Sequence, residues 1–475
     1  MKIKTFLLIV TLLLSQMAGA QIMFQKHYGG SADDYGCRVL QMEDGGYLVA
    51  GITESYGAGY GDIYLIRTNE YGDVLWTKTY GGIDDDVPNT MKKTNDGNII
   101  IAGSTRSYGA GSKDFYLLKI NQNGDTLWTK TYGGIKEESA YDVIQTSDGG
   151  FFVIGNSLTY TFGFSSVYVF KTNSTGEILW SKSYEEANAN SGISAIQLSD
   201  NGFFFCGVAQ QSLINTSDCY FIRTNSQGDT IWTKTFGGND YDGAFQCYDA
   251  GDGIIVSGTT KSFGAGNNDI FLSKFDYDGN NIWYKTFGGT GDEIGGRFAR
   301  TNDNGFILTG YTSSYGMGNQ DVYLIKTDNN GDTVWTRTFG YASIEFAISV
   351  IQTSDNGYAI AGHTNNFSDG FDVYLIKTNS QGISGFERII NETVECIVYP
   401  NPCSGLLNIE SNITDNSDFN IGIYDISGKL LFEKTMPSCE GNRQSLDLNG
   451  LKDGFYLLQL CFENKCIIKK IIIQK

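Results

Sequence analysis

The six tryptophans of this 475-residue chain all lie in copies of one short sequence, and their spacing restricts the fold more than any other feature. One copy runs Gly-Asp-Thr-Leu-Trp-Thr-Lys-Thr-Tyr-Gly-Gly, from Gly124 to Gly134. A further copy, with Phe24 in place of the tryptophan, lies 52 residues before Trp76. The tryptophans follow one another at intervals of 51 or 52 residues, at Trp76, Trp128, Trp180, Trp232, Trp283 and Trp335. Seven evenly spaced copies of one unit indicate a repeat architecture.

Each unit contains four short segments that are typical of β-strands. In the first unit they are residues 38–41, 47–51, 62–67 and 74–78, and we name them strands A, B, C and D. An Asp-Gly or Asn-Gly pair joins A to B in every unit, and these pairs tolerate the backbone of a tight hairpin. The chain is therefore predicted to be all-β, with a seven-bladed β-propeller over residues 21–388. A solenoid of β-arches is the alternative, although solenoid coils are usually shorter than these units.

The two ends of the repeat region complement each other. Residues 21–28 match strand D and precede the first strand A, whereas residues 382–386 end the last unit without its tryptophan. We predict that the N-terminal segment supplies strand D of the last blade. This pairing closes the ring and removes the exposed sheet edges that promote aggregation.

Residues 1–20 have the pattern of a secretory signal peptide. Lys2 and Lys4 precede an apolar run, and Ala18-Gly19-Ala20 forms a cleavage site. The apolar run is too short for a membrane helix, and no later segment is long and apolar enough to span a bilayer. The formal net charge of −19 argues against nucleic acid and anionic membrane surfaces as partners.

The repeat stops before a linker at residues 389–395, and residues 396–475 form a second module. Its alternation and turns predict six or seven strands in a small Ig-like β-sandwich. The module contains Tyr-Pro-Asn-Pro, then Tyr-Asp-x-x-Gly-Lys, then Gly-x-Tyr and a basic terminus. This ordered set resembles the type A C-terminal sorting domain of the type IX secretion system of Bacteroidetes-type bacteria. The resemblance identifies as sorting-motif residues Tyr399, Pro400, Asn401, Pro402, Gly428, Lys429, Gly454 and Tyr456.

The resemblance implies that the type IX secretion machinery is a partner. It also implies export through the periplasm and across the outer membrane, followed by attachment to a surface glycolipid or by release. The repeats resemble the uncharacterised propeller-like repeats of such secreted proteins, which implies a fold and a location but no defined activity.

Three sets of positions are candidates for a binding site, and each has a structural alternative. Ten residues after the tryptophan position, six of the seven units carry an acid: Asp34, Asp86, Glu138, Asp242, Glu293 and Glu345. One interpretation is a ring of carboxylates at the channel entrance that holds Ca²⁺, the sole cofactor candidate. The favoured alternative is that each acid accepts backbone N–H bonds from its own D–A loop.

The B–C loops carry aromatic residues that are candidates for stacking on sugar rings: Tyr56, Tyr108, Phe162, Phe263, Tyr315 and Phe367. Packing against the next blade is the favoured alternative. The longer B–C and D–A loops share one face of a propeller, and binding residues lie more often on such loops than on tight turns.

Fourteen residues after the tryptophan position, the units differ from one another. The residues there are polar and lie on the innermost strand: Arg38, Thr90, Asp142, Ser194, Gln246, Arg297 and Ser349. The charged members Arg38, Asp142 and Arg297 are candidate ligand-binding residues, and ordinary solvation of the channel is the alternative.

The function that the sequence favours is a secreted, surface-displayed, non-catalytic binding propeller with a glycan or protein ligand. A polysaccharide-active lyase or hydrolase and a structural surface-coat protein are the alternatives. The chain contains neither a Gly-x-Ser-x-Gly nor a His-Glu-x-x-His motif, and no residue is assigned a catalytic role.

Overall fold

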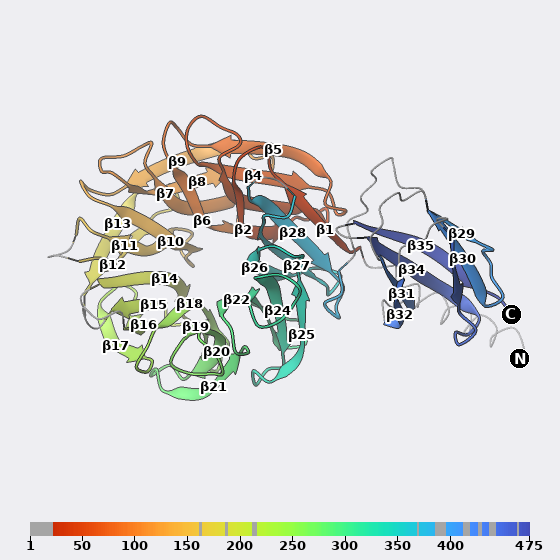
Figure 1. Ribbon diagram of the computed structural model, residues 1–475. Helices are drawn as coiled ribbons and strands as arrows, with labels where there is room; N and C mark the ends of the chain where they lie inside the picture. Colours follow the sequence, from red (N-terminus) through yellow and green to blue (C-terminus); the bar gives the residue numbers. More distant parts are fainter. Residues whose placement is uncertain are drawn as a thin grey trace, which may run out of the picture. The chain divides into compact units, whose positions relative to one another are not determined.

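The computed structural model describes residues 22–160, 164–185, 189–210, 216–367, 370–384, 396–411, 419–425, 430–436, 443–462 and 465–475. The predicted signal peptide and linker, together with Phe162, Gly428 and Lys429, lie outside these residues. The chain divides into two compact units, Met1–Ser384 and Gly385–Lys475. The regular secondary structure of the described residues consists of strands alone (Figure 1).

The first unit consists of seven four-stranded antiparallel sheets, which follow one another around a ring (Figure 1). The first three sheets contain β2 (Asp34–Gln41), β3 (Tyr47–Thr53), β4 (Asp62–Thr68) and β5 (Val74–Tyr80); β6 (Asp86–Lys93), β7 (Ile99–Thr105), β8 (Asp114–Ile120) and β9 (Thr126–Tyr132); and β10 (Glu138–Gln145), β11 (Phe151–Ser157), β12 (Ser166–Thr172) and β13 (Ile178–Tyr184). In each of these three sheets the strands pair in sequence order, with strand A innermost and strand D outermost.

The remaining sheets repeat this arrangement. They contain β14 (Ala189–Gln197), β15 (Phe203–Gln210), β16 (Ser217–Thr224) and β17 (Thr230–Phe236); β18 (Asp242–Asp249), β19 (Ile254–Thr260), β20 (Asp269–Phe275) and β21 (Asn281–Phe287); β22 (Glu293–Arg300), β23 (Phe306–Thr312), β24 (Asp321–Thr327) and β25 (Thr333–Phe339); and β26 (Glu345–Gln352), β27 (Tyr358–Thr364), β28 (Asp372–Thr378) and β1 (Phe24–Tyr28). The prediction of a seven-bladed propeller is confirmed.

The last blade takes its outer strand from the N-terminal segment. Strand β1 pairs antiparallel with β28, and Phe24 lies opposite Lys377. The Phe24 side chain is buried against Tyr47 and Ile66 of the first blade. The ring is therefore closed by non-covalent pairing, as the sequence predicted, and no blade is left with a missing strand.

The core lies between consecutive blades. All seven residues of β4 are buried, because the middle strands of each blade are covered on both faces. Leu48 and Leu65 of the first blade pack with Met91 and Ile101 of the second. Trp76 covers the outer edge of this junction, and its ring leaves no space for a side chain at Gly124 of the next blade. Each tryptophan is thus a contact between two repeats.

Every innermost strand contains a β-bulge at the same position. In β2 the register against β3 shifts between Gly36 and Arg38, so that Cys37 has no opposite partner. A bulge bends its strand and re-aims the side chains that follow it. The bulge therefore helps to set which residue of each blade faces the propeller axis.

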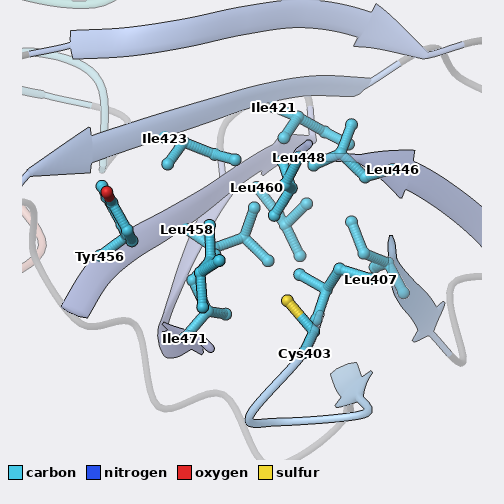
Figure 2. Close-up of a cluster of buried hydrophobic side chains, with 12 residues drawn as sticks. Cys403, Leu407, Ile421, Ile423, Leu446, Leu448, Tyr456, Leu458, Leu460 and Ile471 are labelled. Carbon is cyan, nitrogen blue, oxygen red and sulfur yellow. The ribbon is translucent and has the colours of Figure 1, made fainter. Parts of the chain in front are cut away.

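The second unit contains two antiparallel sheets. One consists of β29 (Cys396–Tyr399), β30 (Leu406–Ser411) and β33 (Arg443–Asp447), and the other of β32 (Leu430–Met436), β31 (Phe419–Asp425), β34 (Gly454–Phe462) and β35 (Lys465–Ile473). Leu407 and Leu446 of the first sheet share a buried cluster with Ile421, Ile423 and Leu458 of the second (Figure 2). Two sheets around one core form the predicted β-sandwich.

The sorting-motif residues of the second unit join its strands. Tyr399, Pro400, Asn401 and Pro402 follow one another at the end of β29. The Asn401 amide donates to the Lys470 carbonyl and accepts the Ile472 N–H, both at 2.8 Å. Gly454 begins β34, and the Tyr456 hydroxyl donates to the Lys452 carbonyl at 2.8 Å.

Candidate functional site

A cavity of about 350 Å³ lies at the propeller axis and is lined by all seven innermost strands. One layer of its wall is the variable set of polar residues, Arg38, Thr90, Asp142, Ser194, Gln246, Arg297 and Ser349. The other layer, two residues further along each strand, is mostly apolar and consists of Leu40, Lys92, Ile144, Ile196, Tyr248, Ala299 and Ile351. The structure therefore brings Arg38, Asp142 and Arg297 into one cavity, on the half of strand A that leads to the A–B hairpin. The sequence pattern named these three residues on the innermost strand, and placed its other candidates, the acids and the loop aromatics, at the opposite, loop-bearing face.

Asp142 is the sole carboxylate among the described lining residues, and its charge is compensated. The Lys92 ammonium lies 2.6 Å from its carboxylate, although the sequence argument did not single out Lys92. The carboxylate also accepts hydrogen bonds from the Thr90 and Ser194 hydroxyls, at 3.3 Å each, and from the Ala195 N–H at 3.2 Å. Three blades thus meet at this buried side chain.

Two further members of the polar layer bridge neighbouring blades. The Gln246 amide donates to the Phe298 carbonyl at 2.8 Å and accepts the Phe298 N–H at 3.0 Å. The Ser349 hydroxyl oxygen accepts the Val39 N–H at 3.4 Å, across the closure between the last and first blades. The five uncharged or acidic members of the layer therefore each bond to an adjacent blade.

The two arginines are different. Arg38 is buried and donates to the carbonyl of its neighbour Cys37 at 2.6 Å. Within the described part of the chain, neither guanidinium has an ion-pair partner, and Arg297 donates no hydrogen bond. Burial, together with the like charge of Arg38, lowers the pKa of Arg297 to about 9, and burial also lowers the pKa of Arg38. Arg297 thus remains protonated at neutral pH.

The six acids at the start of strand A are buried, and each accepts a backbone N–H from the loop before it. The donors are Gly30 for Asp34, Gly82 for Asp86, Gly134 for Glu138, Gly238 for Asp242, Gly289 for Glu293 and Tyr341 for Glu345, at 2.7–3.2 Å. These bonds are the ones expected from the sequence in its favoured alternative, in which each acid accepts N–H bonds from its own D–A loop. Among the residues that the structure describes, no group of three or more His, Cys, Asp or Glu is placed to hold a metal ion.

A second carboxyl group faces each of these acids from the previous blade, which sequence reasoning missed. Oxygens of Asp62 and Asp86 lie 1.7 and 2.7 Å from the point that a Cβ on Gly81 would occupy. The same arrangement joins Asp114 to Glu138, Asp218 to Asp242, Asp269 to Glu293, Asp321 to Glu345 and Asp372 to Asp34. At the remaining junction the two equivalent positions hold the neutral residues Ser166 and Asn190.

Burial raises the pKa of one member in five of these pairs, Asp62, Asp114, Asp218, Asp269 and Asp321, and of Glu345. At Asp62, the nearby Asp86 carboxylate adds to this rise in pKa. Burial likewise raises the pKa of Glu345 to about 7. The absence of both acids at one junction was visible in the sequence. Aligning the start of each strand C with the start of the next strand A would have revealed the carboxyl pairs.

The loop aromatics are held by their own junctions. The Tyr56, Tyr108 and Tyr315 hydroxyls donate to glycine carbonyls of the preceding D–A loop at 2.6–3.0 Å, and each ring stays about half exposed. Phe263 packs 5.4 Å from Tyr284 between ring centroids. In the third blade Tyr160 makes the equivalent bond to the Gly133 carbonyl. These five rings come from five different blades and are not gathered into one site.

Comparisons with known proteins identify the second unit. Residues 397–474 match the family described as secretion system C-terminal sorting domain. Regulatory protein FlaEY of Caulobacter vibrioides is 24% identical over 135 residues, a match that covers 25% of this chain and 14% of that protein. The chain therefore spans only a small part of that relative.

Solved structures with a similar arrangement have low sequence identity. Puromycin hydrolase has a TM-score of 0.47 at 12% identity, over 81% of this chain and 59% of that chain. The β-propeller domain of the Trilobed protease from Pyrococcus furiosus has a TM-score of 0.42 at 9% identity, over 77% of this chain and 99% of that chain.

The sorting domain indicates export through type IX secretion to the cell surface or beyond it. Among the described residues, the structure contains no helix of the length and apolar character needed to cross a membrane. The chain is therefore a secreted β-propeller repeat protein that carries the C-terminal sorting domain of the type IX secretion system.

Proposed function

We propose that this protein is a surface-displayed, non-catalytic binding propeller that holds a glycan or protein ligand at its axial cavity. The observation that carries the proposal is the polar layer of the cavity wall, where seven otherwise similar blades place unlike residues. Five of these residues also bond across blades, whereas Arg38 and Arg297 do not among the described residues, and this leaves the two arginines as the ligand-binding members. Attachment to a surface glycolipid after export would leave the propeller exposed to its ligand.

The state of Asp142 favours binding over hydrolysis. Most glycoside hydrolases use two carboxyl groups on either side of the scissile bond. The described wall of the cavity offers one, and both of its oxygens accept hydrogen bonds while Lys92 compensates its charge. This carboxylate is thus engaged by neighbouring blades, and no second carboxyl group among the described lining residues is placed to act with it.

The experiment uses the chain from Gln21 to Lys475 on a glycan array and in affinity capture with surface proteins of the source bacterium. We expect saturable binding of at least one ligand, with the bound ligand recovered unchanged by mass spectrometry. The double variant Arg38→Gln/Arg297→Gln should lose this binding while keeping the melting temperature of the wild type within a few degrees. Ligand cleavage would contradict the non-catalytic role, and a double variant that binds as well as the wild type would contradict the location.

A further inference from the structure

We propose that the axial cavity binds the oxyanion of an acidic sugar residue, a carboxylate or a sulfate, through the guanidinium groups of Arg38 and Arg297. The inference rests on the proposed function and names the chemical class of its ligand.

The charge of the cavity wall is the first argument. Its described lining residues include three basic side chains and one carboxylate. Lys92 forms the ion pair with Asp142, so that among the described residues Arg38 and Arg297 have no ion-pair partner and the cavity wall keeps a net positive charge. Two like charges in a partly buried space are unfavourable, and an anion between them relieves both their repulsion and their desolvation. This basic cavity lies in a chain whose net charge is −19.

The pattern of hydrogen bonds is the second argument. Thr90, Asp142, Ser194, Gln246 and Ser349 all bond to neighbouring blades, whereas among the described residues neither arginine does. Guanidinium groups present paired N–H donors that match the oxygens of carboxylates and sulfates. Arg38 makes one bond, to the Cys37 carbonyl of its own strand, and Arg297 makes none among the described residues, so their remaining N–H donors are available to a ligand.

The order of the blades places a third donor between the arginines. Ser349 belongs to the last blade, which lies between the blade of Arg297 and the blade of Arg38. Its hydroxyl oxygen accepts the Val39 N–H, so that its own proton remains available for an anion. Arg297, Ser349 and Arg38 therefore line one arc of the wall, on three consecutive blades.

The second layer of the wall favours a sugar as the carrier of the anion. Leu40, Ala299 and Ile351 lie two residues beyond the three donors on the same strands, and Tyr248 is 37% exposed in the same layer. Apolar and aromatic surfaces stack against sugar rings, whose faces are apolar and whose edges are polar. A volume of about 350 Å³ lies at the lower end of the range of small-ligand sites and suits one sugar residue.

The test compares charged sugars with neutral sugars of the same shape. Isothermal calorimetry with the chain from Gln21 to Lys475 measures the binding of trigalacturonate and its methyl ester, and of galactose 6-sulfate and galactose. We expect at least one acidic probe to bind at least tenfold more tightly than its neutral counterpart, because charge-assisted hydrogen bonds are lost without the anion. Added sodium chloride should weaken binding of the acidic probe.

Three variants locate the interaction. Arg38→Gln and Arg297→Gln should each weaken binding of the acidic probe at least about tenfold, and Arg297→Lys should retain part of it, since lysine keeps the charge without the fork. Arg106→Gln is the matched control, because Arg106 lies on a B–C loop beside Glu137 and outside the cavity. It should leave binding unchanged. Melting temperatures establish that every variant is folded.

Four outcomes would overturn the inference. They are equal affinity for acidic and neutral probes, no binding of either acidic probe, unchanged affinity in folded variants of both arginines, and preference for an acetylated tri-glutamate peptide over both sugars. If the wild type binds a neutral glycan and the double variant does not, the proposal of an oxyanion ligand is refuted, while the proposed binding function at the axial cavity is retained. Failure to bind any array or capture ligand would remove both.

Discussion

The carboxyl pair of Asp321 and Glu345 provides a quantitative test of how the blades meet. Glu345 is fully buried, and its carboxylate accepts the Tyr341 N–H and the Thr364 hydroxyl, both at 3.2 Å. An oxygen of Asp321 lies beside it, at the position where a Cβ on Gly340 would clash with both groups. The variant Glu345→Gln removes the ionisable group and keeps its shape, and its amide can donate to Asp321.

The magnitude follows from the shift in proton affinity. Burial raises the pKa of Glu345 to about 7, from 4.5 in the unfolded chain. A difference of this size corresponds to about 3 kcal/mol between the two protonation states. The folded state binds the extra proton, so this group favours folding fully below pH 4.5 and loses its contribution as the pH rises through 7. The wild type should therefore become less stable between pH 5 and pH 8 through this residue.

Urea unfolding followed by tryptophan fluorescence at constant ionic strength measures the effect. We expect the free energy of unfolding of Glu345→Gln to exceed that of the wild type at pH 8, by up to about 3 kcal/mol, and to approach it at pH 5. Asp148→Asn is the control of opposite sign. Although burial opposes it, the hydrogen bonds from Lys171 and Thr146 lower the pKa of Asp148 to about 2. Its contribution is present above pH 3.8 and is lost below, so the variant should be destabilised at both pH 5 and pH 8.

A constant difference between Glu345→Gln and the wild type across pH 5 to 8 would refute the reasoning. It would mean that the Glu345 carboxyl ionises in the folded protein as easily as in water.

Three further predictions concern the ring. Phe24→Ala should destabilise the propeller by about 3–5 kcal/mol, because Phe24 is buried at the closure against Tyr47; thermal unfolding measures it, and an unchanged melting temperature would contradict closure by β1. Gly124→Ala should destabilise the propeller by more than about 1 kcal/mol, because Gly124 has a φ of +78° and a Cβ would lie 2.7 Å from the Trp76 ring. Gly149→Ala is the control, because Gly149 has a similar φ but open space around it, so this variant measures the cost of the backbone conformation alone. Chelation with EDTA should leave the melting temperature unchanged, because the buried acids at the start of strand A already accept loop N–H bonds; a fall that added Ca²⁺ reverses would establish the calcium interpretation instead.

The repeat and its closure could be predicted from the sequence because their causes are local. Alternation, turn pairs and the spacing of the tryptophans act within one unit, and seven copies reinforce each weak signal. The unpaired copy at Phe24 predicted the strand that the last blade lacks. The sorting module was equally readable, because its motifs follow one another in a fixed order.

Tertiary structure alone decided which polar residues are free. Thr90, Asp142 and Ser194 are about 52 residues apart in the chain, yet they touch because consecutive blades pack side by side around one axis. Val39 and Ser349 meet across 310 residues only because the ring closes. The sequence named Arg38 and Arg297 by their charge. The closed ring shows that the other polar residues of this layer bond across blades, whereas among the described residues these two guanidinium groups do not.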